Sequence, residues 1–272
     1  MTRTRRPTSG VVTLAALDVR RRPDHASEMG SQLLMGEVVR VIRRAAGDRW
    51  LRVENLADGY RGWVRAWGLL LAGPRQVARW RRRARARATA LWTEVREAPG
   101  RGPLVTPLFW GARVIAGRVQ GSFRRVELPD GAMGWADSQS LAMGRRAVPA
   151  LLERVRGLLG VPYLWGGRTP TGMDCSGLVQ MLLAEQGHRL PRDAGDQERC
   201  CRPLGPRRRP RSGDLVFFGP PGAPAAHVGI LIGDGAYVHA RGRVRVNSLD
   251  PGNVLYDREL SDQLRGIRSP RT

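Results

Sequence analysis

The sequence contains no lysine: all 46 basic residues are arginine, against 24 acidic residues, and the formal net charge is +22. Such a charge is typical of proteins that bind nucleic acid or an anionic surface, because clustered cations gain affinity from counterion release. The exclusive use of arginine is also what a genome-wide coding bias produces. We favour the coding bias, and we therefore expect neither nucleic acid nor a membrane among the partners.

Cysteine is also scarce, with Cys175 and the adjacent pair Cys200 and Cys201. An odd number that includes two direct neighbours argues against a disulfide framework, so a reducing compartment fits best. No apolar run approaches the roughly 18 residues that a membrane span requires. The basic start of the chain is followed only by a short apolar run, residues 11–17, without a small-residue cleavage pattern. We expect a soluble, cytoplasmic protein.

The first 145 residues contain an internal repeat with a spacing of about 72 to 76 residues. The matching segments are 18–23 with 94–99, 52–54 with 125–127, and 58–63 with 130–135, the last pair reading Asp-Gly-x-x-Gly-Trp in both copies. Short β-branched stretches bounded by Gly and Asp turn signals predict a small antiparallel barrel in each copy. The glycine before each tryptophan is expected to supply a backbone geometry that other residues resist.

The segment between the two copies, residues 75–87, carries seven arginines around Trp80. A basic run with an aromatic residue is one way to bind phosphates. Blocks of like charge usually repel one another and stay exposed, so we interpret this segment as a solvated basic linker.

Beyond residue 146 the pattern changes to helices followed by strands. Apolar residues at helical spacing predict a helix over 148–159, and a second helix is expected over 175–186, closed by Gly187. Strands are expected at three places, namely residues 214–219, 227–233 and 236–240. This order of elements predicts an α+β domain.

Cys175 stands where the second of these helices begins. The backbone N–H groups and the positive end of the helix dipole favour a thiolate there, which would lower the pKa of the cysteine. The same N–H groups are suited to hold the oxyanion of a tetrahedral intermediate. Cys200 and Cys201 have no such context, and we interpret them as incidental.

Histidine is the expected base, and the chain has only four. His227 and His239 lie in neighbouring predicted strands, where one imidazole can face the thiol and the other can fix its tautomer. Each of them is alternatively a core residue bonded to a backbone carbonyl. His25 and His188 lie in polar, loop-like stretches and are taken as surface residues. The spacing of Cys and His matches no zinc motif, so we expect no metal site and no cofactor.

The C-terminal sequence as a whole strongly resembles the NlpC/P60 cysteine peptidases. The resemblance rests on residues 160–167 (GVPYLWGG), 174–180 (DCSGLVQ), 190–193 (LPRD) with Gln197, 213–218 (GDLVFF), 227–230 (HVGI) and 238–240 (VHA). It implies a papain-like α+β fold, with Cys175 as the nucleophile, His227 as the base and His239 as the third polar group.

The N-terminal half resembles bacterial SH3 (SH3b) domains, on residues 20–29, 31–34 and 36–37. Two SH3b domains before the peptidase is the order in γ-D-glutamyl-L-diamino acid endopeptidases, which cut murein stem peptides that keep a free N-terminal L-alanine. The likeness implies that acidic and tyrosine side chains of the first SH3b domain bind the alanine ammonium, and Glu28 and Tyr60 are favoured over Glu37 as the candidates. A carboxylate suits this task because it makes a charge-assisted hydrogen bond with the ammonium.

The same likeness implies substrate contacts inside the peptidase domain, from Tyr163, Asp174, Ser176 and Asp193. One departure is visible: the position after Asp193, often serine in these enzymes, is Ala194. One hydrogen bond to the substrate is then lost or replaced by water.

We therefore expect a multidomain protein of two small all-β SH3b barrels followed by a papain-like α+β NlpC/P60 domain. The expected boundaries are 8–74 for SH3b domain 1, 75–87 for the linker, 88–145 for SH3b domain 2 and 146–272 for the peptidase. The expected function is hydrolysis of the γ-D-Glu–diamino acid bond of murein peptides, by a monomer. Two alternatives remain: a secreted endopeptidase acting on intact peptidoglycan, and a non-catalytic protein that binds the wall or another anionic polymer.

Overall fold

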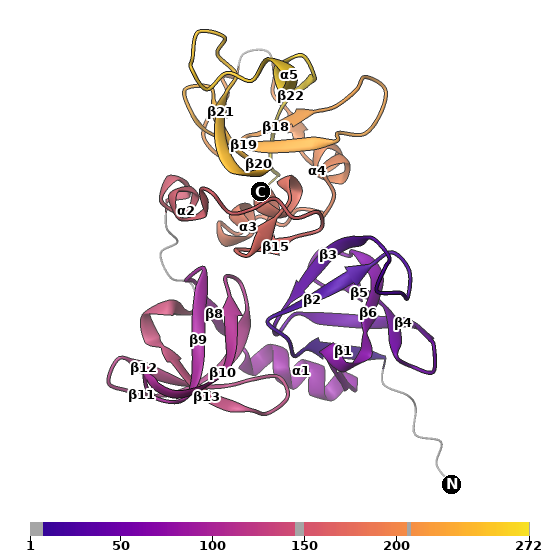
Figure 1. The fold of residues 1–272 in the computed structure, drawn as a ribbon, viewed down its shortest axis with the longest axis vertical. Coiled ribbons are helices and arrows are strands. Elements are labelled where there is room, and N and C mark those ends of the chain that lie inside the picture. The colour runs from indigo at the N-terminus through magenta and orange to yellow at the C-terminus, as the bar shows by residue number, and fades with distance from the viewer. Residues whose placement is uncertain (1–7, 145–149, 206–207, 272) are drawn as a thin grey trace. The chain divides into compact units, whose positions relative to one another are not determined.

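The computed structural model describes residues 8–144, 150–205 and 208–271. The chain divides into two compact units, Met1–Ala147 and Val148–Thr272 (Figure 1). The first unit is built almost entirely of β-strands, and the second combines helices with one larger sheet.

The first unit contains two seven-stranded antiparallel sheets. The strands of the first are β1 Ser9–Val12, β2 Ala16–Arg20, β3 Met29–Leu34, β4 Val38–Ala45, β5 Trp50–Asn55, β6 Arg61–Arg65 and β7 Leu69–Ala72. Those of the second are β8 Ala86–Ala88, β9 Trp92–Ala98, β10 Arg101–Phe109, β11 Arg113–Gln120, β12 Phe123–Glu127, β13 Met133–Asp137 and β14 Leu141–Met143. The spatial orders are β3-β2-β6-β5-β4-β1-β7 and β10-β9-β13-β12-β11-β8-β14, so each strand has a counterpart seven strands further on.

The internal repeat predicted from the sequence is confirmed by this shared strand order. The repeated Gly-Trp pairs lie on the equivalent strands β6 and β13, and Trp63 pairs with Arg20 in the first sheet as Trp135 pairs with Arg96 in the second. Equivalent positions in the two sequence repeats therefore occupy equivalent positions in the two sheets.

The repeated glycine of each pair is required for space. A Cβ at Gly62 would collide with Val19 on the neighbouring strand, and a Cβ at Gly134 would collide with Val95. Neither glycine has a positive φ, so the predicted special backbone geometry is wrong. What excludes other residues is the close approach of the adjacent strand.

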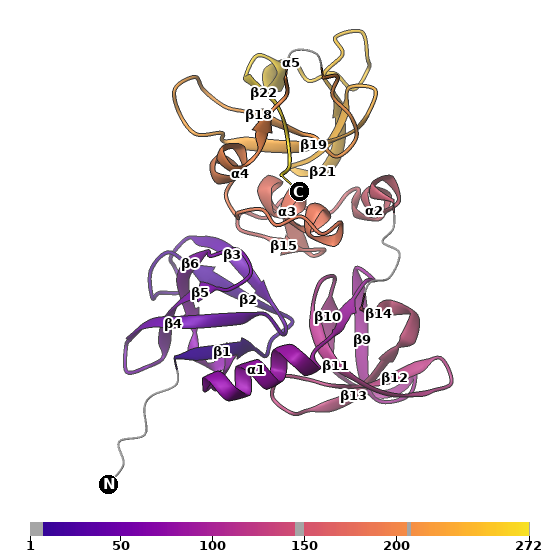
Figure 2. The same ribbon diagram turned by 180° about the vertical axis from the view of Figure 1, so that it is seen from behind.

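The solvated linker predicted over 75–87 is wrong as well. Residues Pro74–Arg83 form the helix α1, which packs against β1 and β7 (Figures 1 and 2). Its arginines face outward, whereas Val77 and Trp80 are only 8% exposed. The Trp80 indole N–H donates to the carbonyl of Gly36 over 3.0 Å. Val77 and Trp80 lie at helical spacing and bury one face of α1, although the composition of the segment as a whole is typical of a solvent-exposed run.

The turn after β3 joins the two sheets of this unit. Met35 is 1% exposed and packs in the apolar core of the second sheet, and the Arg113 N–H donates to its carbonyl over 2.9 Å. Gly36 follows with φ of 82°, and a Cβ there would collide with the carbonyl of Arg113. The two repeats consequently pack through a close backbone contact that only glycine permits.

The second unit is built around a six-stranded antiparallel sheet in the order β17-β22-β18-β19-β20-β21. Its strands are β17 Arg202–Pro203, β18 Leu215–Phe218, β19 His227–Gly233, β20 Ala236–Arg241, β21 Arg243–Ser248 and β22 Leu264–Ser269. The other elements are the helices α2 Leu151–Leu158, α3 Cys175–Glu185, α4 Ala194–Cys200 and α5 Arg258–Ser261, and the small hairpin of β15 Arg168–Thr169 and β16 Gly172–Met173.

The helix α3 is the centre of this unit and packs against β19 and β20 (Figure 2). Almost all of its side chains are buried, including Glu185, whose carboxylate pairs with Arg154 of α2 at 2.6 Å. The helix predicted over 175–186 is confirmed, with Gly187 at φ of 93° ending it. The predicted strands are confirmed as β18, β19 and β20, while α4, β21 and β22 were not predicted.

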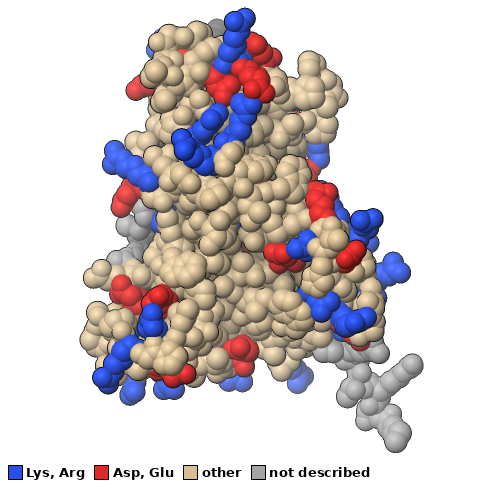
Figure 3. Space-filling model, in the orientation of Figure 1, with Lys and Arg blue, Asp and Glu red and all other residues tan. Residues whose placement is uncertain are grey.

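The positive charge is distributed among many sites. On the face shown in Figure 3, arginine side chains lie in separate groups, several of them beside acidic side chains. Glu54, for example, pairs with Arg40 at 2.6 Å and with Arg61 at 2.7 Å. Within the described residues, no helix is both long and apolar enough to cross a membrane.

Candidate active site

Cys175 is the first residue of α3 and its side chain is buried, with 7% exposed. The preceding residue, Asp174, is the N-cap: its backbone is extended, and its Oδ1 accepts the N–H of Gly177 over 2.7 Å. This cap satisfies one of the unpaired donors of the helix start and fixes where the first turn begins. The helix start predicted at Cys175 is confirmed.

Asp174 is also the centre of a buried ionic network. Arg192 donates to both of its carboxylate oxygens, at 3.0 and 2.6 Å, and the N–H of Gly166 donates to Oδ2 over 2.8 Å. The Ser176 hydroxyl donates to Oδ1 over 3.2 Å and accepts from Arg192 over 2.8 Å. The carboxylate is therefore held on all sides by protein groups, and the turn that carries Cys175 is rigidly anchored.

The thiol of Cys175 is neutral in this environment. Burial raises the pKa of Cys175 to about 12, and the charge of Asp174 adds to the effect. Hydrogen bonds from the backbone of Val228 and Ser176, together with the charge of Arg192, act in the opposite direction but do not outweigh burial. The lowered pKa expected from the helix N-terminus is thus wrong for this structure, because desolvation dominates. Such a thiol needs a base to react.

The predicted base, His227, is the neighbour in sequence of a residue that contacts the thiol. The backbone of Val228, which bonds the Cys175 thiol, belongs to the residue directly after His227 in β19. Burial and the neighbouring His239 lower the pKa of His227 to about 3. Its imidazole is therefore neutral at pH 7 and has one nitrogen able to accept a proton.

The two predicted histidines are in direct contact. His227 Nε2 and His239 Nδ1 are 2.7 Å apart, and the two rings are nearly perpendicular, at 84°. His239 is fully buried in β20, and burial lowers its pKa to about 4. The prediction that neighbouring strands set the two imidazoles side by side is confirmed.

A third side chain, which the sequence did not single out, continues this contact. His239 Nε2 lies 2.8 Å from Oδ1 of Asn247 in β21. The register of β20 and β21 pairs Asn247 with Tyr237, two residues before His239 on the same face. Asn247 therefore reaches His239 diagonally across the two strands, a relationship that only the pairing register reveals.

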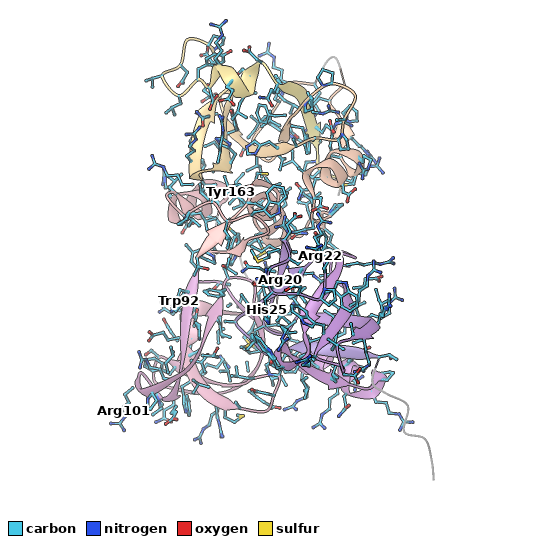
Figure 4. The ribbon with its side chains drawn as sticks, turned by 45° about the vertical axis from the view of Figure 1, so that its right-hand side comes forward. Arg20, Arg22, His25, Trp92, Arg101 and Tyr163 are labelled. Atoms are coloured by element: carbon cyan, nitrogen blue, oxygen red, sulfur yellow. The ribbon has the colours of Figure 1, made fainter. Side chains whose placement is uncertain are left out.

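Tyr163 lies in the segment between α2 and β15 (Figure 4). Burial raises its pKa to about 12, and the nearby Cys175 and Asp174 add to the shift. The phenol is therefore protonated at neutral pH and is placed close to the thiol as a hydrogen-bond donor. The predicted contact of Tyr163 with substrate stays a prediction.

Comparison with known proteins agrees with this geometry. The model of the NlpC/P60 family matches residues 160–261. The second unit is an NlpC/P60 domain. A second model, described as the bacterial dipeptidyl-peptidase SH3 domain, matches residues 19–69, so the first sheet of the other unit belongs to a bacterial SH3 domain.

Two curated relatives illustrate the similarity. The chain is 36% identical over 105 residues to the gamma-D-glutamyl-L-lysine dipeptidyl-peptidase of Bacillus subtilis, covering 38% of this chain and 35% of the relative. It is 34% identical over 136 residues to the peptidoglycan endopeptidase RipB of Mycobacterium tuberculosis, covering 45% of this chain and 55% of the relative. The match thus spans between about a third and about half of the length of these relatives.

One solved structure covers nearly the whole chain. An NlpC/P60 family protein from Bacillus cereus has a TM-score of 0.81 at 21% identity, over 96% of this chain and 99% of that one. Nearly all of the fold, with the β-rich part before the NlpC/P60 domain, therefore has a counterpart among solved structures.

The remaining predicted residues of the NlpC/P60 domain, Ser176 and Asp193, lie at the starts of α3 and α4. Ser176 is buried and bonded as described, and Asp193 is the N-cap residue of α4. Gln197 of α4 donates to the backbone carbonyl of Ser176 over 3.0 Å and to that of Pro191 over 2.9 Å. The contacts of Asp174, Ser176 and Asp193 with substrate stay predictions. Arg192, which lies within the quoted sequence motif, was not recognised as the partner of Asp174.

In the SH3 domain, Glu28 precedes β3 and is about half exposed, and its Oε1 lies 3.9 Å from Nε of Arg21. Tyr60 lies against the same strand, because a Cβ at Gly30 would collide with the Tyr60 hydroxyl and come within 3.4 Å of Arg21 Nε. The fold of this domain therefore brings both candidates to the start of β3. A substrate ammonium at Glu28 would compete with Arg21 for the carboxylate.

The histidines and cysteines to which we assigned no functional role lie outside the candidate site. His25, in the loop after β2 with Arg22 (Figure 4), packs its ring edge-on against Trp50, with centroids 5.1 Å apart. His188 Nδ1 lies 3.3 Å from the carbonyl of Arg271. Cys200 and Cys201 carry free thiols at the end of α4. Among the described residues, no cluster of three or more His, Cys, Asp or Glu side chains forms a candidate metal site.

Proposed function

We propose that this protein is a cysteine peptidase that hydrolyses the bond between γ-D-glutamate and an L-diamino acid in peptides with a free N-terminal L-alanine. The observation that carries the proposal is the array of Cys175 at a helix start, His227 in the adjacent strand and His239 bonded to it over 2.7 Å. The relative named gamma-D-glutamyl-L-lysine dipeptidyl-peptidase supports the choice of bond.

In the proposed reaction, Nδ1 of His227 takes the thiol proton while the sulfur of Cys175 attacks the γ-carbonyl carbon of D-glutamate. The carbonyl oxygen becomes an oxyanion, which backbone N–H groups at the start of α3 stabilise. His227 then returns the proton to the leaving amine as the C–N bond breaks, and a thioester remains. Water, activated by His227, attacks the thioester, which releases the acid and restores the thiol. The reaction requires no cofactor.

Proton transfer from the thiol to His227 is uphill in the site without substrate, because burial raises the pKa of Cys175 and lowers that of His227. The thiol, with a pKa of about 12, and His227, with a pKa of about 3, both start uncharged. Proton transfer and attack then occur together, and the imidazolium that forms is positioned to protonate the amine. The phenol of Tyr163 supplies a further donor near the thiol.

The proposal extends to the domain assignment. We propose a second SH3b domain over 88–145, because its sheet repeats the strand order of the first, and a papain-like fold for the peptidase domain of 146–272. Glu28 and Tyr60 of SH3b domain 1, residues 8–74, are proposed to bind the L-alanine ammonium. A role in peptide recycling in the cytoplasm is part of the proposal and is supported by the low cysteine content.

The test uses L-Ala-γ-D-Glu-diaminopimelate and the same peptide acetylated at its N-terminus, with release of the dipeptide followed by mass spectrometry. We expect cleavage of the first peptide and little cleavage of the second, and Cys175→Ala should cleave neither. Equal cleavage of both peptides would contradict the ammonium site at Glu28 and Tyr60. Full activity of Cys175→Ala would contradict the whole assignment.

The similarity to a relative named peptidoglycan endopeptidase favours a second candidate, action on intact peptidoglycan. Incubation with purified sacculi separates the two. Release of soluble fragments from sacculi at a rate comparable to peptide cleavage would favour the wall as substrate. Binding to sacculi without release would favour the non-catalytic alternative.

A further inference from the structure

A continuous row of hydrogen bonds leads from His227 to the protein backbone. His227 Nε2 and His239 Nδ1 are 2.7 Å apart, and His239 Nε2 and Asn247 Oδ1 are 2.8 Å apart. The Asn247 amide nitrogen then donates to the carbonyl oxygen of Leu255 over 2.8 Å. The row crosses three adjacent strands, β19, β20 and β21, and ends in the segment after β21.

The end of the row determines the position of every proton in it. A backbone carbonyl only accepts hydrogen bonds, so the NH₂ group of Asn247 must face Leu255 and its oxygen must face His239. His239 Nε2 then carries the proton, and its Nδ1 is bare. His227 Nε2 must in turn carry a proton to reach that lone pair, which leaves Nδ1 of His227 as the unprotonated nitrogen.

We propose that Asn247 is a positioning residue that fixes the tautomers of His239 and His227, so that His227 presents an unprotonated Nδ1 to the thiol of Cys175. The inference rests on the proposed function, in which that nitrogen is the base. It deepens that function, because His239 alone orients the His227 ring but does not determine which nitrogen carries the proton. A neutral imidazole between two hydrogen-bonding partners has two tautomers, one for each nitrogen that can carry the proton.

Several charged and polar groups face the same pair of histidines. Arg241 at the end of β20 and Arg245 in β21 lower the pKa of both histidines, and Asp257 acts in the opposite direction. Tyr237 packs against His239, with ring centroids 5.1 Å apart. The two arginines help to keep both rings neutral. Only a neutral ring has two tautomers, so only then does one of them have to be selected.

The role of Asn247 is separable from that of the segment it contacts. The Leu255 carbonyl also accepts the backbone N–H of Ser248 over 2.9 Å, and the Leu255 N–H donates to the side chain of Asn253 over 2.9 Å. The segment is therefore held by bonds that do not involve Asn247. Asn253→Ala loosens the segment without touching the histidines, and it serves as the matched control.

The decisive variants are Asn247→Leu, which removes the acceptor, and Asn247→Asp, which keeps it. Without an acceptor at Nε2, His239 can carry its proton on Nδ1 and donate to His227, whose own proton then occupies the nitrogen that should receive the thiol proton. We expect kcat of Asn247→Leu to fall by at least about 10-fold, with KM little changed. The fall should not exceed the roughly 10²- to 10⁴-fold that a general base contributes. Asn247→Asp should keep most of kcat and move the acid limb of its pH profile upward, because a carboxylate raises the pKa of the histidines.

Nitrogen-15 NMR of histidine-labelled protein reads the tautomers without any substrate. The wild type and Asn253→Ala should show His227 protonated on Nε2, and Asn247→Leu should show a mixture. If Asn247→Leu keeps both the wild-type tautomer and the wild-type kcat, the proposal is overturned. If the tautomers change as expected but no peptide is cleaved by the wild type, the positioning role holds and the proposed function is the part that fails.

Discussion

Two hydrogen-bonded networks meet at Cys175, and they differ in charge. The network around Asp174 is ionic and closed, since Arg192, Ser176 and backbone N–H groups occupy the carboxylate. The network around His227 is made of neutral rings and an amide, in series. The first anchors the turn that carries Cys175, and the second leaves one nitrogen of His227 for the proton transfer that we propose.

The difference follows from the cost of burying polar groups. A buried carboxylate is tolerated when an opposite charge and hydrogen bonds surround it, and the result is a fixed arrangement. A neutral imidazole costs less to bury and can gain or lose a proton during the reaction. Loss of the ionic network should therefore mainly reduce stability, whereas loss of the histidine network should mainly reduce activity.

The largest expected effect is on catalysis. His227→Ala should lower kcat/KM for the unacetylated peptide by about 10²- to 10⁴-fold, because the neutral thiol then has no base. Its thermal unfolding temperature should stay near that of the wild type. His188→Ala, at the surface of the same domain, is the control and should keep full activity. A large loss of stability in His227→Ala would break the contrast between the two networks.

The next effect is on stability. Arg192→Met leaves the buried carboxylate of Asp174 without its partner, which typically costs about 3–5 kcal/mol of unfolding free energy. Urea titration followed by circular dichroism measures this loss. The exposed neighbour Arg189 provides the control, since Arg189→Met should change stability by less than about 0.5 kcal/mol. An Arg192→Met protein as stable as the control would show that the ionic network does not hold the turn.

The third effect concerns the dependence of stability on pH. The pKa of His227 is lowered from 6.5 to about 3 and that of His239 to about 4, so the unfolded chain binds more protons than the folded one at intermediate pH. Their contribution to stability is complete above pH 6.5 and is lost as pH falls towards 3 to 4. Between pH 7 and 4, the wild type should lose more unfolding free energy than a variant with His227→Ala and His239→Phe. Parallel curves for the two proteins would contradict the lowered values.

The sequence predicted the elements that have local signals. The helix at Cys175 was found because its apolar residues and the closing Gly187 are neighbours along the chain. The repeat was found because the copies retain the same short motifs. The helix over Pro74–Arg83 was missed, because the arginines hid the spacing of Val77 and Trp80, and its burial depends on the carbonyl of Gly36 far away in sequence.

The site residues divide in the same way. Cys175, His227 and His239 are rare residue types in recognisable motifs, so they stand out in the sequence. Arg192 is one of many arginines, and nothing local to it names Asp174 as its partner. Asn247 is an ordinary residue in a strand that was not predicted, and its contact with His239 exists only through the register of β20 and β21.

The sequence by itself predicted the chemistry that we propose for this protein: a cysteine at a helix start and two histidines in neighbouring strands predict a nucleophile, a base and its partner. Only the tertiary structure determines the protonation states of these groups. Burial makes the thiol and both imidazoles neutral, because desolvation penalises charge more strongly than the helix start favours it. Strand register then brings Asn247 into line with the two histidines.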